Sequence, residues 1–447
     1  MKARQILTTT ASVSLLGILV VGCGSNGSTN SSNASSNTSS SSGSSQTIQF
    51  TLLKHFNSNE AAFNKQQAQK FESLHPNVKV HVVTAQTGSV YTKLVTLLSG
   101  GQAPNVYYMN GQYFAQLVSE GALSPVNYKA LGVSGLKQLE SEYIPGALDA
   151  YIYKGQLYGI PGEVSDFQAW VNAGDFKAAG ISQLPTTWGQ VAQDAAKLTV
   201  MKNGQVQQEE LALGLNFPGA DWDMLDAIVR EFNNGHGLVS SDGTKSYIDA
   251  PGTIQAFQML QDLVYKYHAW YPSLNGSTTA SERVLFGENK AAMLLDGGSW
   301  YTPVLQQQYP NVYKTATVTP YPTAAGQPSQ AEKYGFAYVV PKAAPNQTLD
   351  WEYVNMMKQQ FALPTFKMGL YMGLKSLSNT STAKSTEFWQ SKWVPSLQTA
   401  HYKVSLVNGT QISQILDQAY VQIVTNHANV ASTLQSAQQQ IQPLLNK

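Results

Sequence analysis

Three short apolar runs decide the fold of this chain: IQFTLL at residues 48–53, VKVHV at residues 78–82 and VYYM at residues 106–109. The middle run alternates Val with polar residues, which is the period of a half-buried strand. Residues 60–73 and 91–98 lie between the runs, and both stretches have a helical pattern. Because strands alternate with helices along this stretch, we predict an α/β lobe.

Further elements of both kinds are predicted toward the C-terminus. Residues 167–172 (FQAWVN) have the composition of a strand, and Thr187 with Gln190 fits a helix capping box. One helix is predicted to begin at Pro251. Another is predicted near residues 430–444, where apolar side chains recur every three or four positions.

The composition of the 447 residues limits the functions that the chain can have. Its 28 Lys and Arg balance 27 Asp and Glu, and a net charge of +1 gives no electrostatic case for a nucleic-acid partner. Hydrophobic residues make up 43% of the chain, which is enough for a large core, and the length allows two or three domains. The single cysteine excludes an intramolecular disulfide and a metal site built on several cysteines.

The N-terminal residues have the pattern of an export signal. Lys2 and Arg4 precede a mostly apolar stretch at residues 6–21, which is short for a membrane span and typical of a secretory signal peptide. The stretch ends in VVGC, and Cys23 is the only cysteine of the chain. This ending resembles the bacterial lipobox, in which the signal is cut before the cysteine and lipid is attached to it. An ordinary signal peptide with an incidental cysteine is the alternative.

The residues that follow the cysteine cannot form a core. Residues 24–45 consist of Gly, Ser, Asn and Thr with a single Ala, a composition typical of a flexible tether. We therefore predict a signal peptide at residues 1–22, and a lipidated Cys23 with a tether over residues 23–46.

Sequence motifs of catalysis are missing. The chain contains neither the phosphate-binding G-x-x-x-x-G-K-[ST] motif nor the zinc-binding H-E-x-x-H motif. Glu163 and Asp166 are candidates for the carboxyl pair of a glycosidase, but nothing in the sequence supplies the rest of such a site. We predict a binding protein rather than an enzyme, with no metal and no cofactor.

Several segments, in order along the chain, resemble the bacterial extracellular solute-binding proteins of sugar ABC transporters, the maltose-binding-like family. The resemblance covers about residues 47–445. It rests on the following segments: Leu98–Val106 (LSGGQAPNV), Gly121–Val126 (GALSPV), Lys154–Pro161 (KGQLYGIP), Ala169–Asn172 (AWVN), Phe176–Ile181 (FKAAGI), Pro185–Trp188 (PTTW), Phe286–Met293 (FGENKAAM) and Gly298–Trp300 (GSW). Asn105 departs from the family pattern, which usually has Asp at that position.

The resemblance implies a two-lobed α/β fold of the periplasmic-binding-protein type (type II), with a hinge and a cleft between the lobes. The first lobe is expected to comprise residues 47–160 and 321–363, and the second to comprise residues 161–320 and 364–447. The chain would then cross between the lobes near Pro161, Pro320 and Leu363.

Ligand contacts are expected on loops at strand ends, where the family places its cleft. A sugar needs aromatic rings for its C–H faces and polar groups for its hydroxyls. On these grounds the candidates are His55, Phe56, Asn57, Asn110, Gln112, Tyr113, Ser165, Asp166, Asp221, Trp222, Trp300, Tyr301 and Tyr371. No Arg is among them, which argues against an anionic ligand such as a phosphate or a dicarboxylate.

The resemblance implies a receptor that captures a carbohydrate, in the first instance an oligosaccharide, and delivers it to the membrane permease of an ABC importer. The protein is expected to be a monomer, held by lipid on Cys23 at the extracellular face of the membrane, or in the periplasm if the host has an outer membrane. Two alternatives stay open, namely a peptide, polyamine or other solute as the ligand, and a tethered carbohydrate-active enzyme.

Glutamine is more abundant than Asp and Glu together. A surface of neutral amides has fewer carboxylates whose protonation can destabilise the fold. An acidic habitat is therefore our hypothesis, with compositional drift as the alternative.

Overall fold

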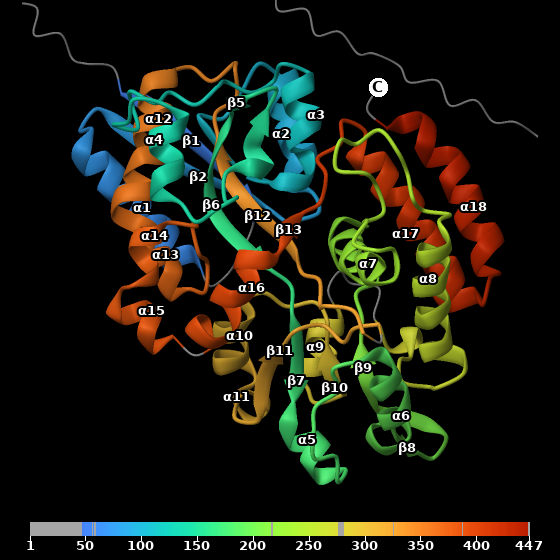
Figure 1. Ribbon diagram of the computed structural model, residues 1–447. Coiled ribbons are helices and arrows are strands. Elements are labelled where there is room, and N and C mark those ends of the chain that lie inside the picture. Colours follow the sequence, from blue (N-terminus) through green and yellow to red (C-terminus); the bar gives the residue numbers. More distant parts are fainter. Residues whose placement is uncertain are drawn as a thin grey trace, which may run out of the picture. The chain divides into compact units, whose positions relative to one another are not determined.

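The computed structural model describes residues 47–55, 57, 60–215, 218–275, 281–324, 326–386 and 388–445 (Figure 1). The predicted signal peptide, Cys23 and the whole tether lie outside these residues, and so does Phe56. None of the helices within the described ranges has the length and the apolar character needed to cross a membrane.

The first sheet contains the three apolar runs at residues 48–53, 78–82 and 106–109. Its strands are β1 (Ile48–His55), β2 (Val78–Ala85), β3 (Val106–Asn110), β6 (Gly159–Asp166), β12 (Glu332–Val339) and β13 (His401–Tyr402). β1 pairs in parallel with β2 and β3, so the predicted strands are confirmed. β12 runs antiparallel to β3 and β6 and parallel to β13, which joins distant parts of the chain in one sheet.

Helices connect and cover the strands of the first sheet (Figure 1). They include α1 (Ala61–Leu74), α2 (Val90–Ser99), α3 (Phe114–Ser119), α4 (Leu136–Glu142) and α12 (Gln347–Met356). The two helices predicted between the first three strands are α1 and α2. Phe71 of α1 is buried against Phe50 of β1 and Tyr353 of α12, with ring centroids 5.0 and 5.1 Å away.

The second sheet has the strand order β11-β7-β10-β9-β8. Its strands are β7 (Ala169–Asn172), β8 (Val200–Lys202), β9 (Gln205–Ala212), β10 (Ala291–Leu294) and β11 (Ala316–Thr319). The helices of this part are α5 (Ala173–Ala178), α6 (Trp188–Leu198), α7 (Pro218–Phe232), α8 (Pro251–Tyr265), α9 (Ser281–Gly287), α10 (Tyr301–Gln308), α11 (Pro310–Tyr313), α17 (Gly409–Asn426) and α18 (Val430–Ile441).

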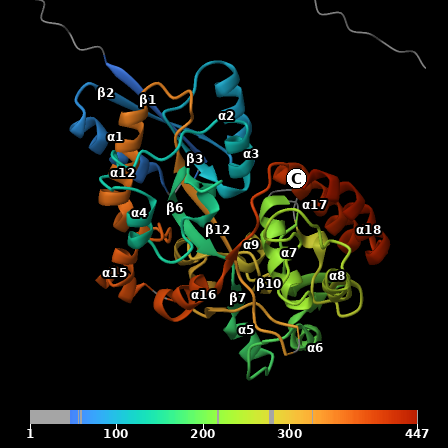
Figure 2. The same cartoon turned by 45° about the horizontal axis from the view of Figure 1, so that its top comes forward.

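Local chemistry sets the helix boundaries that the sequence predicted in this part. The reciprocal capping box of Thr187 and Gln190 begins α6, and Pro251 stands at the start of α8. The apolar faces of α7, α8, α17 and α18 pack together with one another, and Figure 2 shows these helices side by side.

The chain passes between the two sheets through three segments. It leaves the first sheet at residues 167–168, between β6 and β7, and returns at residues 320–331, between β11 and β12. It leaves again at residues 403–408, between β13 and α17. Pro320 is the first residue of the returning segment, and Pro161 lies inside β6.

The segment between α12 and β13 packs on the first sheet's side. It contains α13 (Ala362–Lys367), α14 (Lys375–Ser378), α15 (Ser381–Ser385) and α16 (Val394–Thr399), with π-helical turns at Met357–Phe361 and Trp389–Trp393. Its buried side chains, such as Phe366 and Trp389, belong to the same apolar cluster as Phe50 of β1. The lobe boundaries, the crossing near Leu363 included, stay a prediction.

Candidate functional site

A cavity of about 270 Å³ lies where strand ends of the first sheet meet α7 and α17. Asn110 is the last residue of β3 and lines the cavity. Its side-chain oxygen accepts a hydrogen bond of 3.0 Å from the backbone N–H of Gln112 and holds the following turn in place. This turn brings Gln112 and Tyr113 into the cavity wall. One face of the Tyr113 ring is covered by Tyr91, with ring centroids 4.1 Å apart and planes 6° from parallel.

The side of the cavity formed by β12 and β13 is rich in tyrosine. Lys333 and Tyr334 come from β12, Tyr402 from β13, and Tyr151 from the turn before β4 (Ile152–Tyr153). Within the described residues, the hydroxyls of Tyr151 and Tyr402 are buried and have no hydrogen-bond partner, and the same is true of Ser405. Because unpaired buried hydroxyls are costly, these groups are suited to polar atoms of a ligand.

The opposite wall comes from the start of α7 and the first turns of α17. Trp222 and Asp223 of α7 face the cavity together with Thr410, Ser413 and Gln414 of α17.

An ion pair joins the two walls of the cavity. Lys403, in the crossing segment after β13, forms an ion pair with Asp223, and its Nζ lies 5.5 Å from the Trp222 ring centroid. Burial raises the pKa of Asp223 to about 6, although Lys403 opposes the shift.

Four of the predicted ligand residues line this cavity: Asn110, Gln112, Tyr113 and Trp222. His55 and Asn57 do not. The His55 ring lies 4.8 Å from Phe336 and 5.7 Å from Tyr108, centroid to centroid, and burial lowers its pKa to about 4. Asn57 donates a hydrogen bond of 3.0 Å to Glu60.

The polar candidates Ser165, Asp166 and Asp221 are also away from the cavity wall. All three are buried, and Asp166 accepts a hydrogen bond from Ser396. Burial raises the pKa of Asp166 to about 7 and that of Glu163 to about 8. Neither Glu163 nor Asp166 lines the cavity, so the two carboxyls considered for a glycosidase are not brought together there.

The three C-terminal aromatic candidates, Trp300, Tyr301 and Tyr371, are not among the residues that line the cavity. Trp300 is half-buried, the Arg283 guanidinium sits 4.7 Å from its ring centroid, and its Nε1 donates to the Tyr334 hydroxyl. Trp300 therefore reaches the cavity only through Tyr334. Tyr301 is buried and donates a hydrogen bond of 2.5 Å to the Arg283 carbonyl.

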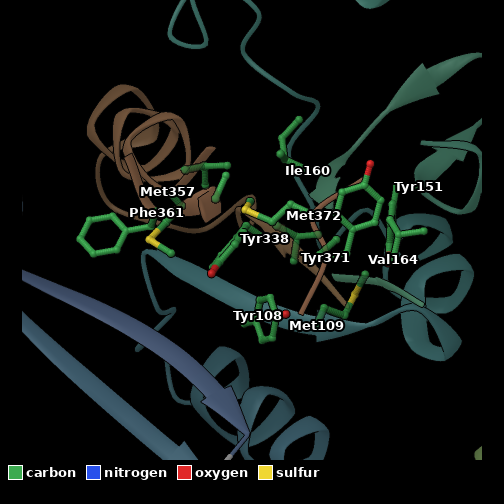
Figure 3. Packing of buried hydrophobic residues seen from close by; sticks show 14 of the residues in the cluster. Tyr108, Met109, Tyr151, Ile160, Val164, Tyr338, Met357, Phe361, Tyr371 and Met372 are labelled. Atoms are coloured by element: carbon green, nitrogen blue, oxygen red, sulfur yellow. The ribbon is translucent and has the colours of Figure 1, made fainter. Parts of the chain in front are cut away.

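Tyr371 is a core residue. It is 1% exposed, and its hydroxyl donates a hydrogen bond of 2.9 Å to the Leu374 carbonyl. Figure 3 places it with Met372 among side chains of β6 and β12.

Sequence reasoning missed most of the residues on the β12 and β13 side and all those on α17. Lys333, Tyr334, Tyr402 and Lys403 carry no motif, and only the pairing of β12 with β13 brings them to the site. In the described part of the chain, no group of three or more His, Cys, Asp or Glu is placed to hold a metal ion.

Two α/β sheets joined by three crossing segments, with a polar and aromatic cavity between them, define a two-lobed binding protein. The chain belongs to the bacterial extracellular solute-binding protein family, whose profile matches residues 56–360. It is 20% identical over 271 residues to a protein of Brucella abortus (strain 2308) whose name describes it as a binding protein. The match covers 60% of this chain and 62% of that protein, so the chain spans about three fifths of this relative's length.

Solved structures share the two-lobed fold. One is the GacH receptor of Streptomyces glaucescens, studied without ligand and with acarbose, at a TM-score of 0.77 and 19% identity. The similarity covers 89% of this chain and 98% of that one. Another is an ABC transporter solute-binding protein of Thermotoga lettingae bound to α-D-tagatose, at a TM-score of 0.78 and 19% identity over 90% of this chain and all of that one.

Proposed function

We propose that this protein is the carbohydrate receptor of an ABC importer and that it has no catalytic activity of its own. The observation that carries the proposal is the cavity wall, which combines aromatic rings with amide and hydroxyl groups. Tyr113, Tyr334 and Trp222 offer ring surface, and Gln112 and Gln414 offer donors and acceptors for hydroxyls. The ligand-bound relatives named above support the same class of ligand.

The mechanism of such a receptor is a shift between two arrangements of the lobes. Gln112 and Tyr113 follow a strand of the first sheet, whereas Trp222 and Gln414 belong to helices packed with the second. A ligand that contacts both sets gains more free energy when the lobes close on it, so it shifts the population toward the closed form. A membrane permease would then recognise that form.

A ligand screen tests the proposal directly. Thermal unfolding of the full chain would be followed with mono- and oligosaccharides, peptides and polyamines, because a bound ligand raises the apparent stability by mass action. We expect stabilisation by at least one sugar, stoichiometric binding in calorimetry, and recovery of that sugar unchanged. Stabilisation by peptides or polyamines alone, or hydrolysis of the sugar, would contradict the proposal.

The membrane anchor is tested separately from the ligand. We propose that lipid on Cys23 holds the protein at the outer face of the membrane, so Cys23→Ala should abolish lipid attachment and release or misprocess the protein. The measurement is the distribution between membrane and soluble fractions, with Ser25→Ala in the same segment as the matched control. Membrane retention of Cys23→Ala at the wild-type level would contradict the lipid-anchor proposal.

A further inference from the structure

Lys333 places a positively charged ammonium group in the cavity wall. An uncharged sugar would supply no negative charge to pair with it. Lys333 lines the cavity and is 6% exposed, yet its Nζ makes no hydrogen bond or ion pair with any residue that the structure describes. The nearest aromatic contact is loose, at 5.9 Å to the Tyr402 ring centroid. A buried, unpaired ammonium is costly, and a bound counter-charge would remove that cost.

The charges around the cavity leave Lys333 incompletely balanced. Asp223 is the only carboxylate among the described lining residues, and Lys403 already pairs with it. Asp149 and Asp166 act on Lys333 from outside the cavity, Asp166 as its register partner on β6, but neither carboxylate of this described pair forms an ion pair with the Lys333 ammonium. The lining side chains therefore carry one positive charge in excess.

Two tyrosine hydroxyls near Lys333 can donate hydrogen bonds to the same negatively charged group. Tyr402 is the register partner of Lys333 across β12 and β13, and Tyr151 lines the same part of the cavity. Both hydroxyls are buried without a partner in the described residues. One ammonium and two phenolic O–H groups make a set of donors for two negatively charged oxygens, and donors of this kind bind a carboxylate more strongly than a neutral hydroxyl.

We infer that the cavity takes an acidic carbohydrate, a sugar or oligosaccharide that bears a uronate carboxylate, and that Lys333 with Tyr151 and Tyr402 binds that carboxylate. The inference rests on the proposed carbohydrate function and narrows its ligand class. The absence of Arg from the predicted contacts does not exclude an anionic ligand, because Lys333 lines the cavity and was not among those contacts.

Matched sugar pairs that differ only at C6 test the inference. Galactose would be compared with galacturonate, and α-1,4-galactobiose with α-1,4-digalacturonate, by calorimetry on the full chain. We expect the acidic member of a pair to bind at least about tenfold more tightly, the effect of one charge-assisted contact. Its affinity should also fall as NaCl rises from about 50 to 500 mM, while that of the neutral member stays constant.

Lys333→Met keeps the length of the side chain and removes its charge. We expect this variant to lose the preference for the acidic member of each pair. Lys342→Met, at an exposed lysine outside the cavity, is the matched control and should retain the preference. If Lys333→Met does not fold, the salt dependence of the wild type still decides whether the cavity binds the acidic member through its charge.

The possible failures are distinguishable. Wild-type protein that binds the neutral member as tightly as the acidic one, or more tightly, overturns the carboxylate site and leaves the carbohydrate proposal standing. An acid preference that survives in Lys333→Met overturns the role of Lys333. If no sugar of either kind binds here or in the wider screen, the proposed function itself fails.

Discussion

Lowering the pH from about 8 to about 5 is expected to stabilise this protein, by several kcal/mol in the free energy of unfolding. The reason is a set of carboxyl groups buried without a nearby cation. Burial raises the pKa of Glu163 and of Glu231 to about 8, and that of Glu210 to about 9. Both carboxyl oxygens of Glu210 are buried and have no hydrogen-bond partner among the described residues.

The direction of the effect follows from proton binding. In the unfolded chain these glutamates titrate near 4.5, so between that pH and 8 only the folded protein holds the protons. Their contribution to stability is fully present below about pH 4.5 and is lost as the pH rises through the folded-state pKa, by up to about 1.4 kcal/mol per group and pH unit.

His55 acts in the opposite direction. Burial lowers its pKa from 6.5 to about 4, so its contribution is present above pH 6.5 and is lost as the pH falls toward 4. Burial also lowers the pKa of His401, so two histidines oppose several carboxyl groups. We therefore expect the greatest stability between about pH 4.5 and 6. This optimum would suit the acidic habitat suggested by the glutamine-rich composition.

Thermal unfolding between pH 4 and 8.5 measures the effect. Glu163→Gln mimics the protonated carboxyl and should flatten the loss of stability above about pH 6. Glu140→Gln, at an exposed position on α4, is the matched control and should follow the wild type. A wild-type melting temperature that drops steeply between pH 6 and pH 4 would contradict both the prediction and the acidic-habitat hypothesis.

The parts of the fold that the sequence predicted are those with local signals. β1, α1, β2, α2 and β3 have periodic patterns and turn residues within a single stretch, and the capping box at the start of α6 spans four residues. Asn110, Gln112 and Tyr113 line the cavity and were predicted for the same reason, because they lie at or just after the end of a recognisable strand.

The rest of the site depends on contacts between distant segments. β13 is two residues long and has no period to detect, yet its pairing with β12 places Tyr402 and Lys333 side by side. Tyr371 was predicted from a local signal, but contacts with a distant segment keep it out of the cavity wall. Its glycine-flanked segment has the composition of an exposed loop, but the backbone N–H of Val164 donates a hydrogen bond of 2.6 Å to the Tyr371 carbonyl and holds the segment against β6.

Truncation of Trp222 is the second change from which we expect a large effect. Trp222 is 3% exposed, lines the cavity and also packs in the apolar cluster around α7 and α17. Trp222→Ala should therefore lower the free energy of unfolding by about 3–5 kcal/mol, the usual loss for a buried tryptophan. It should also weaken carbohydrate binding about tenfold to a hundredfold, because ring surface for the sugar is lost.

A matched control separates the two effects of this truncation. Trp351 of α12 is 1% exposed and belongs to the first sheet's apolar cluster, away from the cavity lining. Trp351→Ala should lose as much stability as Trp222→Ala and keep the wild-type affinity, when both are measured by calorimetry at a temperature at which the variants are folded. Equal affinity losses in the two variants would mean that destabilisation alone weakens binding. An affinity of Trp222→Ala within about twofold of the wild type would remove Trp222 from the binding site.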